Sequence, residues 1–489
     1  MGTTSNATFL DERWEGRLFD GEWTSTGTTL DVVEPATGKL LATVGQATAA
    51  DVGRAAAAAR RAQEPWAATA PRERAEVFRK AAAVLEAHAD EVALYVVRET
   101  GGIVPKGQHE VREAAMILHL AASLVMQPCG QVLPSTPGRL SYAQRVPLGV
   151  VGVISPFNFP LILSIRSVAP ALALGNAVVV KPDPHTPVSG GFLIARAFEE
   201  AGLPAGLLHV LPGGVEAGEA LCSDPNIQMV AFTGSPSAGR RVGELAGRHL
   251  KKTSLELGGS NALIVLDDAD LDLAASNAAW GAYLHQGQIC MASNRIVAHE
   301  SIADALVERL AGKATHLPVG DPATEEVALG PLINERQRDR VHGIVHDSVE
   351  AGATLEAGGT FDQLFYRPTV LSGVRPGMRV FDEEVFGPVA SVVTFSTDDQ
   401  AVELANDTTG SLAAGVISSS VSHAMAIGAR LRCGMVHVND QTVNDECINP
   451  FGGPGSAGNG TSVGAAADAD LYTQWQWVTV KDAPPQYPF

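Results

Sequence analysis

The chain has 489 residues, of which 45% are hydrophobic and 18% are charged, and its formal net charge is −19. Such a length exceeds one compact core, so the composition predicts a globular protein of two or three domains. The negative charge argues against a nucleic-acid partner and against a basic membrane-docking face. The five cysteines form no CxxC pair, which argues against a disulfide framework and a zinc ribbon.

The sequence shows no targeting or membrane segment. The first thirty residues are polar and acidic, without the charged start and apolar run of a signal peptide. The most apolar stretch, residues 146–180, contains Arg166 and four prolines, which interrupt it well short of a membrane span. We therefore expect a soluble, cytoplasmic protein.

The N-terminal half begins with short strands and turns at residues 18–47, followed by helical sequence at 50–127 and a projecting ribbon at 128–147. From residue 148, short apolar runs alternate with helical stretches near 160–174 and 187–201. The runs are GVVGVIS (149–155), NAVVVKP (176–182), LLHVLP (207–212) and QMVAFTG (228–234). Unbroken apolar strands are typical of sheets covered on both faces, so this alternation predicts a parallel, doubly wound sheet.

A second α/β unit follows. Its predicted elements are a strand at 261–267, a helix at 270–286 and strands at 294–300, 389–395 and 434–440. The segment YTQWQWVTV (472–480) alternates aromatic and polar residues, which predicts a further strand.

Three residues in connecting loops are candidates for catalysis. Cys290 lies in a Gly- and Gln-rich loop, where a thiolate would be a strong nucleophile, although a lone cysteine is more often a small buried hydrophobe. Glu256 ends a predicted strand before a Gly-Gly turn and could be a general base on water or a solvated cap residue. Asn158, in the rigid loop SPFNFP, could donate to an oxyanion or bond its own backbone.

Other motifs indicate a nucleotide. Gly234 and Gly239 follow a predicted strand and begin a helix, an arrangement that can bind a pyrophosphate. The spacing of the glycines differs from GxGxxG, and no P-loop lysine follows. Lys181 lies at the carboxyl end of a strand, where α/β sheets bind ligands. Glu384 and Phe386 precede Gly387 and could contact a ribose and a ring.

The histidines do not indicate a metal. His342 and His346 are four residues apart, but Gly343 stands where a zinc protease needs glutamate, so we predict no metal site. His285, five residues before Cys290, could form a Cys–His pair, but a histidine in the pocket wall is the favoured interpretation.

Together these motifs resemble the aldehyde dehydrogenase superfamily from about residue 18 to the end. They follow the order and spacing of that family throughout the chain. The matching motifs are SPFNFP (155–160), KP (181–182), FTGSPSAG (232–239), LELGG (255–259), GQIC (287–290), EEVFGP (383–388) and PFGG (450–453). Details such as LHQGQICMAS (284–293) look closest to the benzaldehyde and vanillin dehydrogenase branch.

The resemblance implies a covalent mechanism. Cys290 would attack the aldehyde carbon, and the Asn158 amide and the backbone N–H of Cys290 would hold the oxyanion. Hydride transfer to the coenzyme would leave a thioester, which water activated by Glu256 would hydrolyse. Lys181 would bind the adenosine ribose, Glu384 the nicotinamide ribose, and Phe386 would pack near the nicotinamide.

The resemblance also implies the remaining contacts of coenzyme and substrate. The further coenzyme contacts would be Ser155, Pro156, Phe157, Gly234, Ser235, Gly239 and Leu257. An aromatic aldehyde, such as benzaldehyde, would meet apolar pocket walls, although these residues could instead be core packing. The expected walls are Phe159, Leu163, Tyr283, Leu284 and Ile289.

The chain departs from the family at three places. Pro184 stands where strict NAD enzymes often carry a glutamate that grips the ribose, so we expect NAD as coenzyme with NADP also accepted. Arg166 replaces an aromatic pocket residue of many relatives. Gln474 follows Tyr472 and Thr473 where the family often has Tyr-Thr-Glu, which leaves this segment a structural role.

The resemblance implies an α/β fold with a Rossmann-like, doubly wound cofactor domain, a second α/β catalytic domain and a small β-strand oligomerisation ribbon. Residues 1–127 and 148–257 would form the NAD(P)-binding domain, 258–457 the catalytic domain, and 128–147 with 458–489 the oligomerisation segments. A homodimer or homotetramer is expected.

Alternative functions are an aliphatic or semialdehyde dehydrogenase, a CoA-acylating aldehyde dehydrogenase and a non-catalytic scaffold protein. CoA-acylating relatives usually lack the glutamate of LELGG, whereas Glu256 is present here. A scaffold would not need Cys290, Asn158 and Glu256 together, so the hydrolytic enzyme is favoured.

Overall fold

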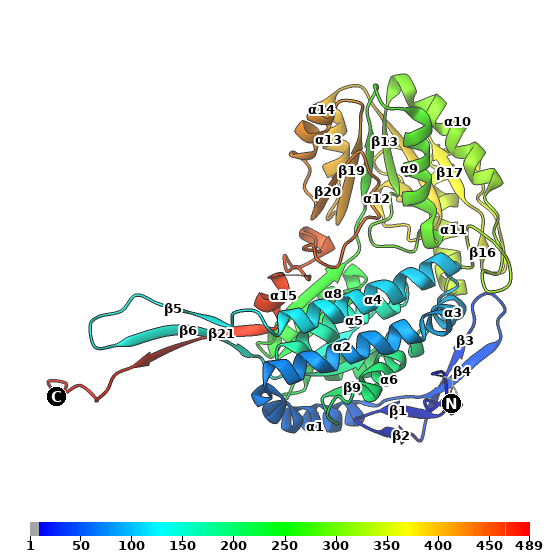
Figure 1. Ribbon diagram of the computed structural model, residues 1–489. Coiled ribbons are helices and arrows are strands. Elements are labelled where there is room, and N and C mark those ends of the chain that lie inside the picture. Colours follow the sequence, from blue (N-terminus) through cyan, green and yellow to red (C-terminus); the bar gives the residue numbers. More distant parts are fainter. Residues whose placement is uncertain (1–8, 465) are drawn as a thin grey trace, which may run out of the picture.

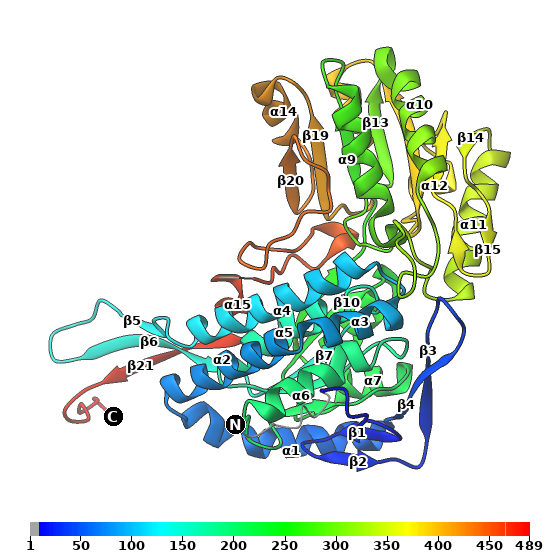
Figure 2. The same ribbon diagram turned by 45° about the vertical axis from the view of Figure 1, so that its right-hand side comes forward.

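The computed structural model describes residues 9–464 and 466–489. It consists of two lobes and a projecting arm (Figures 1 and 2). Residues 1–8 of the predicted cofactor domain and residue 465 of the predicted oligomerisation segments lie outside the described residues. Within the described part, no helix has the length and apolar character needed to cross a membrane.

The lower lobe contains a seven-stranded sheet with the order β11-β10-β7-β8-β9-β1-β2. Its five parallel strands are β7 (Val150–Ile154), β8 (Ala177–Lys181), β9 (Leu208–Val210), β10 (Met229–Gly234) and β11 (Lys252–Leu257). Every residue of β7 and β8 is buried, which explains their unbroken apolar sequences. The predicted doubly wound sheet is confirmed. It is extended by an antiparallel edge hairpin of β1 (Arg17–Phe19) and β2 (Trp23–Ser25), because a short turn can join only antiparallel neighbours.

Helices pack around this sheet. They are α1 (Ala49–Ala68), α2 (Pro71–Ala87), α3 (Ala89–Thr100), α4 (Val104–Leu124), α5 (Pro160–Ala173), α6 (Leu193–Glu200), α7 (Val215–Ser223) and α8 (Pro236–Arg248). The helix expected at 187–201 begins with a π-helical segment, Val188–Phe192, before α6. Helix α4 packs against α2, α3 and α5 and runs along the side of the lower lobe that faces the upper lobe (Figures 1 and 2).

The upper lobe contains a second seven-stranded sheet, with the order β14-β17-β18-β13-β12-β19-β20. Only β14 runs antiparallel to its neighbour. The strands are β12 (Ala262–Val265), β13 (Arg295–His299), β14 (Thr354–Ala357), β17 (Thr369–Ser372), β18 (Val389–Phe395), β19 (Ala413–Ile417) and β20 (Met435–Val438). The helices are α9 (Leu271–Tyr283), α10 (Glu300–His316), α11 (Glu335–Glu350), α12 (Arg379–Asp382), α13 (Asp398–Asn406) and α14 (Val421–Gly428). Two small hairpins complete the lobes, β3 (Thr29–Val33) with β4 (Leu40–Gly45) and β15 (Phe361–Asp362) with β16 (Phe365–Tyr366).

The arm is a three-stranded antiparallel ribbon of β5 (Gly130–Val132), β6 (Leu140–Pro147) and β21 (Thr473–Val480), and β21 follows the short helix α15 (Ala466–Leu471). Strands β6 and β21 pair along all eight residues of each, so the predicted ribbon and the predicted C-terminal strand form one sheet. Trp475 and Trp477 remain 52% and 66% exposed on it.

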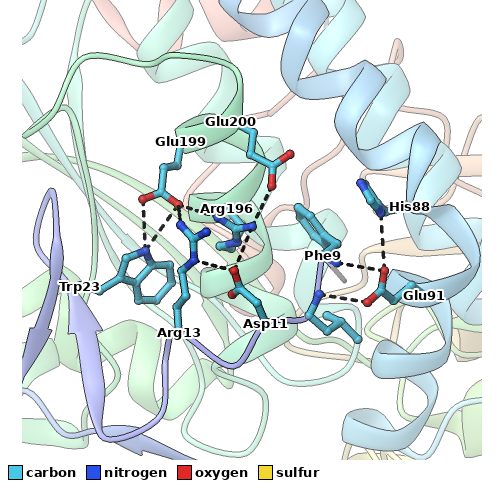
Figure 3. Close-up of polar contacts among 10 residues, drawn as sticks. Phe9, Asp11, Arg13, Trp23, His88, Glu91, Arg196, Glu199 and Glu200 are labelled. Atoms are coloured by element: carbon cyan, nitrogen blue, oxygen red, sulfur yellow. Dashed lines mark hydrogen bonds and ion pairs between the residues drawn. The ribbon is translucent and has the colours of Figure 1, made fainter. Parts of the chain in front are cut away.

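The first described residues bind the helical side of the lower lobe (Figure 3). The Phe9 N–H donates to a Glu91 carboxylate oxygen on α3 over 3.3 Å, and the Phe9 ring stacks on His88 at 4.9 Å. Arg196 on α6 lies over the same ring and pairs with Asp11 at 3.5 Å. These contacts hold the segment before β1 against α3 and α6.

Asn176 ties the first sheet to the C-terminal segment. Its fully buried amide donates to the carbonyl groups of Ala171 and Tyr472, both at 2.9 Å, and accepts the Gly149 N–H over 3.0 Å. The ends of α5, β7 and the residue before β21 therefore meet at one side chain.

We expect Asn176→Ala to lower the free energy of unfolding by about 3 kcal/mol, because it leaves the buried Gly149 N–H and the Tyr472 carbonyl without their partner. A lower urea midpoint would show this loss. Asn277→Ala, which removes one bond on the exposed part of α9, serves as the control and should change stability by less than about 0.5 kcal/mol. Equal midpoints for the two variants would contradict the prediction.

Candidate active site

The two sheets meet at the junction of the lobes with opposite strand ends. In the lower sheet the chain reverses its direction of winding between β7 and β10, and ligands bind such sheets at the carboxyl ends beside this point. The loop 155–159 follows β7, Ser235 follows β10, and Lys181 and Glu256 lie at the ends of β8 and β11. In the upper sheet, by contrast, Asn261 immediately precedes β12, and the Cys290 loop lies just before β13.

Cys290 lies on a sharply turned loop between α9 and β13. His285 and Gln286, in the 3-10 turn Leu284–Gly287, have φ of 47° and 56°, a left-handed conformation that is strained for side chains with a Cβ. A Cβ at Gly287 would collide with the carbonyl of Gly387, so the loop packs closely on the segment before β18. Cys290 itself is partly exposed at the end of this turn.

Asn261 holds the Cys290 loop in place. Its Nδ2 donates to the carbonyl oxygens of Cys290 at 2.7 Å and Ala292 at 3.2 Å, and its Oδ1 accepts the N–H groups of Leu412 and Ala413. The sequence analysis missed this residue. Its position directly after the LGGS turn was the available signal.

Glu256 is a buried carboxylate without a hydrogen-bond partner among the described residues. The residue is 6% exposed, and neither side-chain oxygen is bonded. Burial raises the pKa of Glu256 well above its usual value, Arg166 opposes this shift, and Asp445 adds to it. A carboxyl group with a raised pKa is suited to general-base work near neutral pH.

The same charges influence the Cys290 thiol. Burial raises the pKa of Cys290, and the carboxylates of Glu384, Asp445 and Glu256 raise it further, whereas Arg166 lowers it. The negative charge of Glu256 therefore disfavours ionisation of the Cys290 thiol. Proton transfer from the thiol to a base favours formation of the reactive thiolate.

Asn158 reaches across to the Cys290 loop. The residue is 3% exposed, and its Nδ2 donates to the Gln288 carbonyl over 2.9 Å. The Gln288 side-chain oxygen in turn accepts the Ile333 N–H over 3.0 Å. The three candidate catalytic residues are thus brought together from the ends of β7 and β11 and from the loop before β13.

The residues at the carboxyl ends of β8, β10 and β11 in the lower sheet fit a dinucleotide. Ser235 caps α8 by accepting the Ala238 N–H, and a Cβ at Gly239 would collide with Leu257, so the helix start approaches the end of β11 closely. Lys181 is buried, its pKa is lowered by burial, and its Nζ donates to the Pro182 and Gly213 carbonyls.

The upper lobe supplies Glu384 and Phe386 to the same region. Burial raises the pKa of Glu384 to about 7, and its Oε1 has no partner in the described residues. The Phe386 ring lies 5.9 Å from that of Phe157, edge to face. A buried, unpartnered acceptor next to two aromatic rings suits a ribose and a planar ring of a coenzyme.

A small pocket of about 10 Å³, room for about one water molecule, lies beside Glu256. Leu163, Arg166, Phe451 and Val463 line it together with Glu256. Arg166 also lines a larger cavity of about 490 Å³ between α4, α5 and α15. Arg166 pairs with Asp445 at 2.6 Å and lies over the Phe451 ring, but its Nε and Nη1 are buried without partners among the described residues.

The predicted pocket residues separate in the structure. Leu163 lines the pocket, whereas Leu284 and Ile289 pack in or against the lower core and Phe159 packs against His285. Tyr283 belongs to the core of the upper lobe, where its hydroxyl donates to the Thr369 carbonyl over 3.2 Å. Tyr283 therefore packs in the core and does not line the pocket, because α9 turns its last residue toward β17.

The histidines lie apart from this chemistry. Neither His285 nitrogen has a hydrogen-bond partner in the described residues, so no Cys–His pair is formed with Cys290. His342 contacts the Tyr366 hydroxyl. His346 is exposed on α11 beside Asp347, which pairs with Arg379.

Comparisons with known proteins agree with this geometry. The sequence pattern of the aldehyde dehydrogenase family matches residues 23–478. The chain is 54% identical over 481 residues to a vanillin dehydrogenase of Amycolatopsis sp., covering 98% of this chain and 99% of that protein. It is 49% identical over 478 residues to a benzaldehyde dehydrogenase [NAD(+)] of Pseudomonas putida, covering 97% and 98%.

A solved structure is similar along nearly the whole length. The betaine aldehyde dehydrogenase of Staphylococcus aureus in complex with NAD+ superposes with a TM-score of 0.95 and 30% sequence identity, covering 99% of each chain. The predicted family resemblance is thereby confirmed. With its two α/β lobes and its cysteine loop at their junction, the chain belongs to the aldehyde dehydrogenase family.

Proposed function

We propose that this enzyme oxidises aromatic aldehydes to carboxylic acids with NAD, through a covalent adduct on Cys290. The main support is the buried, unpartnered Glu256 carboxylate, which lies beside a small pocket and whose charge raises the pKa of the Cys290 thiol. The relatives named as vanillin and benzaldehyde dehydrogenases support the substrate class.

In the first step the Cys290 sulfur bonds to the aldehyde carbon, and the thiol proton is released to solvent. Glu256 is thus left to accept the proton of water in the hydrolysis step, for which its raised pKa suits it. The negative charge that develops on the aldehyde oxygen is held by the Asn158 amide and the backbone N–H of Cys290.

In the second step the carbon loses a hydride, which NAD+ accepts when bound, and Cys290 retains the acyl group as a thioester. Water then attacks the acyl carbon, Glu256 takes its proton, and the acid leaves as the thiol re-forms. Lys181, Ser235, Glu384 and Phe386 are proposed to hold the coenzyme. Further contacts are proposed from Ser155, Pro156, Phe157, Gly234, Gly239 and Leu257.

We propose that a ring with an oxygen substituent lies beside Arg166. The cavity of about 490 Å³ that Arg166 lines is large enough for such a ring, and Leu120, Leu124 and Pro170 offer apolar walls there. The buried Nε and Nη1 of Arg166 are donors that a hydroxyl or methoxyl oxygen on the ring could satisfy. Burial of such donors without a partner is costly, so the oxygen-bearing substrate gains selectivity from them.

Coenzyme choice, assembly and location extend the proposal. Pro184 offers no carboxylate that would repel a 2′-phosphate, so we propose NAD as the coenzyme with NADP also accepted.

We propose that the ribbon mediates a homodimer or homotetramer, because Val132, Trp475 and Trp477 are exposed on it. All five cysteines are free thiols, which supports a cytoplasmic location.

The three-part division of the chain is also proposed. The parallel strands of the first sheet lie within 148–257, and the strands of the second sheet lie within 258–457. This supports a cofactor domain of residues 1–127 and 148–257 and a catalytic domain of residues 258–457. The ribbon strands support oligomerisation segments at 128–147 and 458–489.

A panel of aldehydes tests the substrate class. We expect kcat/KM with NAD to be higher for benzaldehyde and its hydroxylated and methoxylated relatives than for acetaldehyde, with slower but measurable rates with NADP. Arg166→Met should reduce the advantage of the oxygen-substituted rings over benzaldehyde by about tenfold, as for loss of a buried hydrogen bond. A preference for acetaldehyde would overturn the assignment.

Removal of the nucleophile should abolish turnover. In Cys290→Ala we expect no detectable NADH formation and nearly unchanged binding of NAD, measured by fluorescence titration, since only the covalent adduct is lost. Cys129→Ala, at an exposed cysteine on the arm side of α4, is the matched control and should retain activity. Substantial turnover by the Cys290 variant would exclude the mechanism.

Glu256→Gln should uncouple the two halves of the reaction. We expect a burst of NADH followed by a steady state about 10²–10⁴-fold slower, because general-base assistance to water is lost. In the wild type, hydrolysis should slow as the pH falls through the raised pKa of Glu256, since only the ionised carboxylate accepts a proton. A steady state that keeps its rate and its pH profile in the variant would show that another group is the base.

A further inference from the structure

A buried ion pair on α4 lies against the beginning of α5. Lys106 and Glu110 are 4% and 0% exposed, and Lys106 Nζ lies 2.5 Å from Glu110 Oε1. The other oxygen of Glu110 accepts the N–H groups of Leu161 at 3.0 Å and Ile162 at 3.3 Å. The N-cap residue of α5, Phe159, makes no side-chain cap of its own. A carboxylate from another helix therefore caps α5.

This cap is directly connected to the proposed oxyanion donor. Asn158 immediately precedes Phe159, so the first turn of α5 fixes where the Asn158 side chain starts. Lys106 Nζ lies 4.7 Å from the centre of the Phe159 ring, and the His285 ring packs on the same ring at 5.3 Å. The pair thus touches the segment that carries Asn158 and, through Phe159, the turn that leads to Cys290.

Stability alone does not account for a charged pair at this place. Removing two charges from water is costly, and burial lowers the pKa of Lys106 even though Glu110 opposes the shift. Apolar side chains of similar size would pack as stably in many buried sites. They could not, however, accept two backbone N–H groups at a fixed position, which is what Glu110 does.

We propose that Glu110, held by Lys106, is a positioning residue for the oxyanion site: it fixes the first turn of α5 and thereby the Asn158 amide. This inference rests on the proposed function, in which Asn158 donates to the oxyanion. Glu110 acts through Asn158 and does not itself meet the substrate.

A kinetic double-mutant cycle tests the proposal. The variants are Glu110→Gln, Asn158→Ala and the two combined, and the measurement is the single-turnover rate of NADH formation at saturating NAD. We expect Glu110→Gln to slow this step about tenfold through misplacement of the amide, and Asn158→Ala to slow it about 10²–10³-fold. The combined variant should be no slower than Asn158→Ala, because the interaction that Glu110 supports is already absent.

Glu99→Gln is a matched control. Glu99 is also 0% exposed, and it likewise accepts two backbone N–H groups, those of Val188 at 3.0 Å and Ser189 at 2.7 Å, at the start of a different helical segment. It should lower the thermal midpoint as Glu110→Gln does, yet change NADH formation by less than about twofold. In combination with Asn158→Ala its small effect should simply multiply.

The outcomes separate the two proposals. If Glu110→Gln slows the Asn158→Ala enzyme as much as it slows the wild type, Glu110 acts elsewhere and the positioning role is overturned. If Asn158→Ala itself leaves the rate unchanged, the oxyanion role within the proposed function is overturned instead. Should Glu110→Gln fail to fold with Lys106 unpaired, the cycle is run with Lys106→Met and Glu110→Gln together, which leaves no buried charge, and the same two results decide it.

Discussion

The active site depends on the hydrogen bonds of one side chain, the amide of Asn261. It joins the backbone carbonyls of Cys290 and Ala292 to the N–H groups of Leu412 and Ala413 at the start of β19. A buried amide with both ends satisfied is rigid, because any rotation would leave backbone groups unpaired. The Cys290 loop is therefore fixed to the sheet of the upper lobe.

The opposed polarity of the two sheets determines which side chains meet at the junction of the lobes. The carboxyl ends of the lower strands present Asn158, Lys181 and Glu256, and the amino ends of the upper strands present the Cys290 loop and Glu384. No single sheet end could provide this combination. Contacts such as that of Asn158 with the Gln288 carbonyl show how closely the two sets of loops meet.

The buried carboxylates near the junction of the lobes are of two kinds, those with unpartnered oxygens and those whose oxygens are bonded. Glu256 and Glu384 carry oxygens without partners, and burial raises the pKa of each. Both oxygens of Glu99 and Glu110 are engaged, by backbone N–H groups and, for Glu110, by Lys106. Carboxylates with unsatisfied oxygens are free for substrate, water or coenzyme, whereas satisfied ones hold helices in place.

The sequence alone determined the alternating strands and helices and the ribbon, because periodicity is a local signal. The catalytic trio was proposed from the resemblance of its motifs to a family, since each motif alone is weak. The resemblance also indicated Arg166 as an unusual pocket residue. Only the tertiary structure decided which apolar residues face the pocket, since Leu163 and Tyr283 look alike in sequence but α5 and α9 present them to different surroundings. The role of Asn261 likewise required the fold, because its partners come from segments about 30 and 150 residues away, beyond the reach of local patterns.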